Sequence, residues 1–140
     1  MRKLLFLVLI LLYSCSSSSD SALALEPCGD FVIENQTIYD ATDISNYTTT
    51  DVNVLNNCIT VRITSSGCDG NSWTASLIDS EQETLSIPPE RFLRLELTNN
   101  EACQSVFERS YTFDISTIRV TGSGTLVLNL DGWNSPIVIN

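Results

Sequence analysis

Apolar and polar residues alternate with a period of two through most of this chain, and that pattern limits the folds open to it. Val52 and Val54, then residues 59–63 and 93–97, place an apolar residue at every second position. In an extended strand, successive side chains point to opposite faces, so the pattern is typical of strands with one buried face. No segment shows an apolar stripe at helical spacing. The chain is therefore predicted to be all-β.

Turn-forming residues divide the alternating runs into about seven strands. Asn56-Asn57 tolerates the positive φ angles of a tight turn, and Pro88-Pro89 cannot donate to a strand ladder. Breaks that recur roughly every 8–12 residues are typical of a β-sandwich or barrel. We expect an antiparallel β-sandwich, immunoglobulin-like or similar, with one strand bulged near Arg109. The expected strands lie near residues 52–54, 59–64, 73–77, 93–97, 107–113, 126–130 and 137–139.

The amino terminus has the pattern of an export signal. Arg2 and Lys3 precede an unbroken apolar run of nine residues, 4–12. That run is shorter than the ~20 residues that span a bilayer and fits a signal peptide. The following Leu12-Tyr13-Ser14-Cys15 resembles the lipobox of bacterial lipoproteins, with an unusually bulky residue at Tyr13. The resemblance implies that residues 1–14 are removed and that Cys15 carries the lipid. An ordinary secretory signal is the alternative.

A polar segment separates Cys15 from the folded part. Residues 16–19 are all serine, and such low-complexity sequence is typical of a flexible spacer. Asp20-Ser21-Ala22 also resembles the O-glycosylation site of Bacteroidota envelope proteins, which makes Ser21 a candidate for modification. We expect residues 15–25 to form a lipidated tether and residues 26–140 to form one β-sandwich domain.

Four further cysteines predict two disulfides in the exported chain. Cys28, Cys58, Cys68 and Cys103 are even in number, and an exported chain meets an oxidising compartment. Cys58 and Cys68 lie toward opposite ends of a predicted strand about 20 Å long, whereas a disulfide needs Cα atoms within ~7 Å. We favour Cys28–Cys58 with Cys68–Cys103, and Cys28–Cys68 with Cys58–Cys103 is the alternative. A zinc site is disfavoured because no CxxC pair occurs.

Composition argues against several functional classes. Without Arg2 and Lys3 the chain keeps five basic residues, all Arg, against 17 acidic ones, a net charge of −12 that disfavours nucleic acid and anionic lipid faces. His is absent, and Lys is absent after residue 3, which removes the imidazole base and the Schiff-base lysine. No nucleophile elbow occurs, and the acidic residues single out no catalytic pair. We expect no catalytic activity, no cofactor and no resident metal.

Several motifs occur in an order that resembles a known family. They are the SSGCxGxSW motif ending at Trp73, the PPxRxL sequence at residues 88–93 and the NNExC sequence at residues 99–103. Residues 111–115 and 128–133 follow in the same order. Together they resemble a family of small lipoproteins from Bacteroidota, flavobacteria especially, over about residues 50–135. The resemblance implies an outer-membrane or cell-surface location and no particular activity.

The two tryptophans are the aromatic candidates for a binding site. Trp73 lies on the apolar phase of its strand beside a cysteine, so we expect it in the core. Trp133 lies in the turn Asp131-Gly132-Trp133-Asn134, where an exposed ring could contact a sugar or a partner. We therefore take Trp133 and Asn134 as possible ligand contacts, with packing over the end of the sandwich as the alternative.

Acidic turns and charged pairs have structural explanations first. Asp69-Gly70-Asn71 offers oxygen ligands for calcium, but EF-hand spacing is absent and turn geometry explains the residues. Arg91 and Arg94 are expected to pair with carboxylates, and Glu101 to cap a turn or form a salt bridge.

These observations predict a lipid-anchored protein of the cell envelope, located at the outer membrane. It would act without catalysis, as an accessory subunit that binds a protein partner. A glycan or small-ligand binding module is the alternative. A flat apolar patch or a long unpaired edge strand would favour the first hypothesis, and an exposed Trp133 would favour the second.

Overall fold

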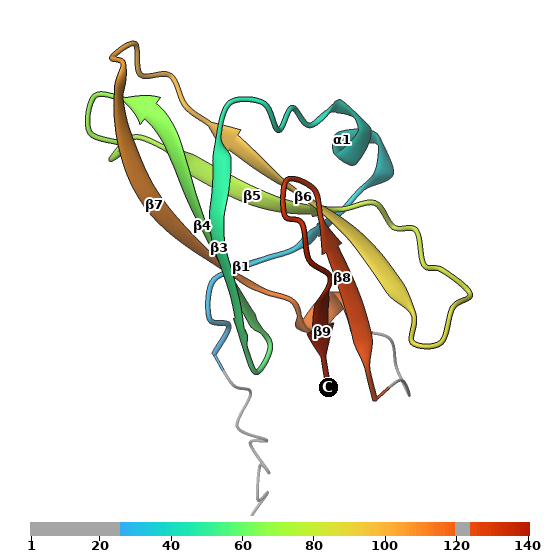
Figure 1. Cartoon of the computed structure of the whole chain (residues 1–140). Coiled ribbons are helices and arrows are strands. Elements are labelled where there is room, and N and C mark those ends of the chain that lie inside the picture. The colour runs from blue at the N-terminus through green and yellow to red at the C-terminus, as the bar shows by residue number, and fades with distance from the viewer. Residues whose placement is uncertain (1–25, 120–123) are drawn as a thin grey trace, which may run out of the picture.

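Two β-sheets packed face to face make up residues 26–119 and 124–140, the part of the chain that the computed structural model describes (Figure 1). One sheet has four strands in the order β1-β7-β4-β3, and the other has five in the order β2-β5-β6-β8-β9. The elements are β1 (Asp30–Phe31), β2 (Ile33–Glu34), α1 (Gln36–Ala41), β3 (Thr48–Leu55), β4 (Cys58–Gly67), β5 (Thr74–Asp79), β6 (Glu90–Thr98), β7 (Ser105–Asp114), the 3-10 turn η1 (Ser116–Ile118), β8 (Leu126–Leu130) and β9 (Ile137–Ile139).

The core lies between the two sheets and is built from the alternating runs. The inward residues of β4 meet those of β6 and β8 in one hydrophobic cluster with Leu77 and Phe113. Each fully buried Leu, Ile, Val or Phe stabilises the fold by about 1.5–3 kcal/mol. The all-β sandwich is thus confirmed. The inward residues of these three strands are Ile59, Val61, Ile63, Leu93, Leu95, Leu97, Leu126, Leu128 and Leu130.

The described chain has nine strands instead of about seven, and the two extra strands are β1 and β2. Each has two residues, too few for an alternating pattern to be recognised. They belong to one segment that passes from the edge of one sheet to the edge of the other. The purely antiparallel prediction is also wrong, because β1 pairs with β7, β2 with β5 and β6 with β8 in parallel.

The bulge expected near Arg109 lies in β3 instead. Ten consecutive residues of β4 pair with ten of β7 without a shift in register. In β3, Thr49 pairs with Ile63 and Asp51 with Arg62, so Thr50 is the additional residue. Arg109 interrupts the apolar pattern of β7 because its guanidinium binds a neighbouring loop, as described below.

One short helix, α1, was not expected. The Asn35 side chain caps it by accepting a hydrogen bond from the Ile38 N–H at 2.9 Å. With six residues, of which Tyr39 is buried, it is too short to show a helical stripe. Within residues 26–119 and 124–140, no helix is long and apolar enough to span a membrane.

Both favoured disulfides are confirmed. Cys28 is bonded to Cys58 with a Cα–Cα distance of 6.0 Å, and Cys68 to Cys103 with 4.7 Å. Cys58 begins β4 and Cys68 directly follows its end, so the length of this strand keeps the two apart. The first disulfide fixes the start of the described chain to β4, and the second joins the β4–β5 and β6–β7 connections.

Candidate partner-binding surface

The connection between β5 and β6 presents two apolar side chains entirely to solvent. Leu85 is 103% exposed and Ile87 is 99% exposed, more than any other large hydrophobic residue in the described part of the chain. The connection extends away from both sheets, as the yellow segment in Figure 1 shows. Apolar groups in that environment contribute nothing to the core. Their exposure makes this connection the candidate binding surface of the described chain.

Hydrogen bonds hold this connection in shape. The Thr84 N–H donates to the Glu90 carbonyl at 3.3 Å, and the Glu90 N–H donates to the Thr84 hydroxyl at 3.0 Å. The Ser86 hydroxyl donates to the Pro88 carbonyl at 2.8 Å. These bonds tie the two sides of the tip together, while Leu85 and Ile87 point outward. We call residues 84–88 the apolar tip.

A buried ion pair anchors the base of the apolar tip. Asp79 is fully buried at the end of β5, and Arg91, 7% exposed, lies in β6 two residues before Leu93, the register partner of Asp79. Arg91 donates to the two carboxylate oxygens of Asp79 at 2.9 and 3.0 Å and to Glu34 at 2.8 Å. Burial opposes the charge on Arg91, but the hydrogen bonds and charges of Asp79 and Glu34 outweigh it and raise the pKa of Arg91. The expected pairing of Arg91 and Arg94 with carboxylates is confirmed, and the partner of Arg94 is Asp131.

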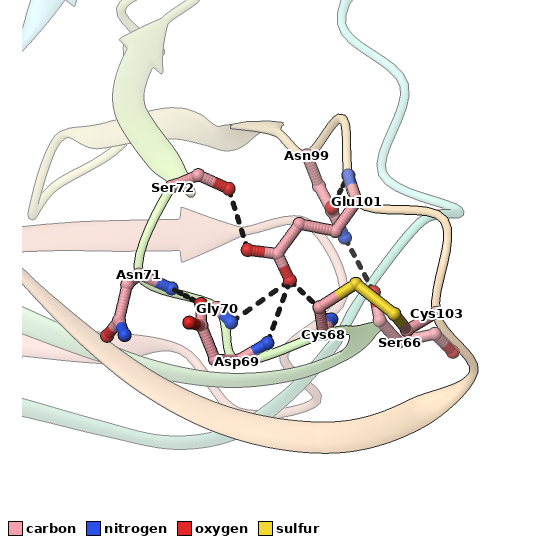
Figure 2. The surroundings of a disulfide bond; sticks show 9 residues. All are labelled: Ser66, Cys68, Asp69, Gly70, Asn71, Ser72, Asn99, Glu101 and Cys103. Carbon is pink, nitrogen blue, oxygen red and sulfur yellow. Dashed lines mark hydrogen bonds between the residues drawn. A yellow bond between two sulfur atoms is a disulfide. The ribbon is translucent and has the colours of Figure 1, made fainter.

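A second ordered region lies at the opposite end of β5, around the Cys68–Cys103 disulfide. One carboxylate oxygen of Glu101 accepts hydrogen bonds from the N–H groups of Cys68, Asp69 and Gly70 at 2.6, 3.1 and 3.0 Å. The other accepts from the Ser72 hydroxyl at 2.6 Å. Figure 2 shows these bonds converging on Glu101 beside the disulfide. The bond from Ser72, with those from the three N–H groups, lowers the pKa of Glu101 to about 2. Glu101 was expected to cap a turn or to form a salt bridge, and the structure shows that it caps the turn.

Arg109 of β7 binds the other side of the same turn. Its guanidinium donates to the Gly70 carbonyl at 3.1 Å, to the Asn71 side chain at 3.0 Å and to the Asp69 carbonyl. Glu101 therefore satisfies the N–H groups of the turn, and Arg109 satisfies its carbonyls. The role of Arg109 in holding this turn was not recognised from sequence. Its only signal was a charged residue at an apolar position of its strand.

Hydrogen bonds within the turn account for the residues around Asp69. The Asp69 carboxylate accepts a hydrogen bond from the Asn71 N–H at 2.8 Å, and Gly70 has a φ of +69°. Throughout the described ranges, no group of three or more His, Cys, Asp or Glu residues is arranged to hold a metal ion. The explanation by turn geometry accounts for this segment.

The two tryptophans differ in exposure. Trp73 is 5% exposed and belongs to the core, as expected. Trp133 packs half-buried against the core, and its backbone N–H donates to the Leu130 carbonyl at 3.0 Å. Residues 129–136 line a hollow of about 210 Å³ that includes Trp133 and exposed Asn134. Asp131 in this turn is bound by Arg94 at 2.7 Å. The structure thus brings Trp133 and Asn134 to one hollow but covers part of the indole ring.

Two predicted sites lie outside the described residues, namely the lipidated Cys15 and the candidate glycosylation site Ser21. The apolar tip was not predicted, because Leu85 and Ile87 alternate with polar residues and the sequence alone does not show that they are exposed. The adjacent Pro88-Pro89 was the signal that this alternation belongs to a connection.

Comparisons with known proteins support the architecture. No protein-family model matches the chain, and no curated protein matches it. Among solved structures, it is similar to a protein of unknown function, DUF1344, from Bacteroides vulgatus, with a TM-score of 0.52 and 13% sequence identity. The match covers 79% of this chain and 56% of that one, so this chain spans little more than half of that protein's length. At this identity the likeness shows the fold alone.

Proposed function

We propose that this protein is a lipid-anchored, non-catalytic β-sandwich of the outer membrane that binds another protein. The lipobox-like sequence at Cys15 and the serine spacer support the anchor. The observation that carries the binding role is the apolar tip, where Leu85 and Ile87 are fully exposed on a hydrogen-bonded connection. A preordered apolar projection is suited to a pocket on a protein surface, because little conformational entropy is lost when it binds.

The charge of the surrounding chain favours a protein over a membrane as the molecule that covers the tip. Glu81 and Glu83 are exposed beside it, and the whole chain has ten more acidic than basic residues. Anionic lipid would repel this surface, whereas a protein pocket with a basic rim would attract it. The partner we propose therefore offers an apolar pocket bordered by Lys or Arg.

A photo-crosslinking experiment tests this function in intact cells. Benzoylphenylalanine replaces Leu85 in one strain and Val138 in another, since Val138 is also apolar and 58% exposed but lies on β9. We expect a discrete protein adduct from position 85 and a much weaker one from position 138. A Glu83→Lys substitution should reduce the adduct at position 85, because it reverses a charge beside the tip. Equal labelling at both positions would contradict the proposal.

A glycan-binding module is the second candidate, and the hollow beside Trp133 is the observation that favours it. The hollow combines a partly accessible indole with the polar side chains of Asn129, Asn134 and Ser135. Glycan arrays probed with the wild type and with Trp133→Ala test this role. Glycan binding that Trp133→Ala removes would establish it, and the absence of binding would leave the protein-binding role.

A further inference from the structure

The outer border of β7 is open along most of its length. β1 pairs only with Phe113 and Asp114, the last two of the ten residues of β7. On its other side, every residue of β7 pairs with β4. Figure 1 shows β7 at the margin of its sheet, where β1 adjoins only a small part of it. Residues 105–111 of β7 therefore form a long edge with no strand beside it in the described part of the chain.

The free backbone groups of this edge can be identified from the register. The Asp114 carbonyl accepts a bond from the Val32 N–H at 3.3 Å on the outer side, so the even-numbered residues of β7 direct their backbone groups outward. The odd-numbered residues bond to β4. Among these outward groups, the Glu108 carbonyl is occupied by its neighbour Arg109 at 2.9 Å. No described residue bonds the backbone groups of Val106 and Ser110 or the Glu108 N–H.

The opposite border of the same sheet is protected, whereas the β7 border is not. β3 has the bulge at Thr50, a device that prevents edge-to-edge pairing. β7 contains no proline, glycine or bulge, and its register with β4 is continuous. A protein that protects one edge and leaves the other regular is suited to accept a strand on the regular one.

The N-terminal segment limits how far an added strand can extend. Gly29 lies so close to the Thr112 carbonyl that even a Cβ atom at Gly29 would clash with it. A strand added to β7 must therefore end before Thr112, which leaves residues 105–111. Along this stretch Phe107 and Tyr111 face inward and are half-buried, and Val106, Glu108 and Ser110 are exposed on the outer face.

The geometry points to β-strand addition: an extended segment of the partner protein pairs with residues 105–111 of β7. This inference rests on the proposed protein-binding function and specifies how the partner engages the sandwich. The inward-facing residues of the added strand would be apolar, to cover Phe107 and Tyr111. A second copy of this chain is a poorer occupant. Antiparallel pairing of two β7 strands about Glu108 or Arg109 would place like charges opposite each other.

Variants at Ser110 separate strand addition from other contacts. Ser110 is exposed, and its outward N–H is outside the β4–β7 ladder. Ser110→Pro removes that donor, whereas Ser110→Ala keeps it. With benzoylphenylalanine at Val106, the partner adduct should fall by about tenfold in the Ser110→Pro background and stay unchanged with Ser110→Ala. Benzoylphenylalanine at Asn53, exposed on β3 at the other border, is the positional control.

Hydrogen exchange then tests the mode of binding. The probe is a synthetic peptide with the sequence of the partner segment crosslinked to position 106, added to the purified full chain. We expect the amides of Val106, Glu108 and Ser110 to exchange quickly in the free protein and to become protected with the peptide. Those of Phe107, Arg109 and Tyr111 should be slow in both states. Binding of the peptide that leaves the exchange of these three outward amides unchanged would overturn the inference.

The remaining outcomes are also decisive. An adduct at position 85 without one at position 106 would overturn strand addition and leave the proposed function intact. No adduct at either position would remove both. A crosslink at position 106 to a second copy of this chain, with a dimer in solution that Ser110→Pro dissociates, would overturn the assignment to a different protein.

Discussion

Breaking the buried ion pair between Asp79 and Arg91 should cause a large loss of stability. Asp79 is fully buried, and Arg91 satisfies both of its carboxylate oxygens. Arg91→Met removes the guanidinium but fills much of its space, so the carboxylate keeps its desolvation and loses its counter-charge. Removing one partner of such a pair costs about 3–5 kcal/mol. A domain of this size has about 5–15 kcal/mol of total stability.

Urea denaturation followed by tryptophan fluorescence measures this loss, because Trp73 is in the core. With an m value of about 2 kcal/mol per molar urea, the midpoint should fall by about 1.5–2.5 M. The double variant Asp79→Leu with Arg91→Met should regain most of the lost stability, since it leaves no buried charge without a partner. Recovery should be incomplete by about 1 kcal/mol, because the Glu81 N–H loses its acceptor on Asp79.

Arg62→Met is the matched control for this experiment. Arg62 and Glu108 are 3.7 Å apart and both side chains are about half exposed, at 47% and 54%. Pairs of this kind contribute about 1 kcal/mol or less. If Arg91→Met cost no more than Arg62→Met, or if the double variant were no more stable than the single one, the account of the buried pair would be refuted.

Three further predictions concern the Glu101 turn, the space around Gly67 and the lipid anchor. Because the pKa of Glu101 is lowered to about 2 in the fold, its stabilising effect should be complete above pH about 4.5 and lost as the pH falls toward 2. The protection factors of the amides of residues 68–70, taken relative to unprotected amides at the same pH, should therefore fall over that range in the wild type and should already be low at neutral pH in Glu101→Gln. Gly67→Ala should cost about 1–3 kcal/mol in urea denaturation, because the new Cβ would lie 2.6 Å from the Trp73 ring and clash with Glu101, whereas Gly124→Ala meets nothing within 4 Å and should be neutral. Labelled palmitate should enter the wild type and not Cys15→Ala, and labelling of the variant would contradict the lipobox.

Strands with strong alternation could be predicted from sequence, because burial on one face leaves a period-two pattern. The central inward positions of β4, β6 and β8 follow this rule, whereas the buried Ser65 and Arg91 on the same faces do not. The disulfide pairing could be predicted for a different reason. The length of β4 separates Cys58 from Cys68, so a Cys58–Cys68 disulfide is disfavoured. Two connectivities remain, and the observed one is the one favoured from sequence.

Features that depend on contacts between distant segments could not be predicted. β1 and β2 exist because the N-terminal segment reaches the ends of β7 and β5, and two residues carry no pattern of their own. Arg109 breaks the apolar alternation of β7 only because a turn about 40 positions earlier offers it carbonyl groups. The full exposure of Leu85 and Ile87 could not be predicted either, since alternation is a property of the sequence and exposure is a property of the fold.

The Cys28–Cys58 disulfide determines how mechanical load enters the molecule. A pull on the chain before residue 26 reaches Cys28 first, and the S–S bond passes it to the beginning of β4. β1, with its two paired residues, is bypassed and is not peeled from the sheet. The force instead reaches β4, which is held by ten pairs to β7 and by seven to β3. A protein tethered at its N-terminus would thus resist extension through its longest strand pairing.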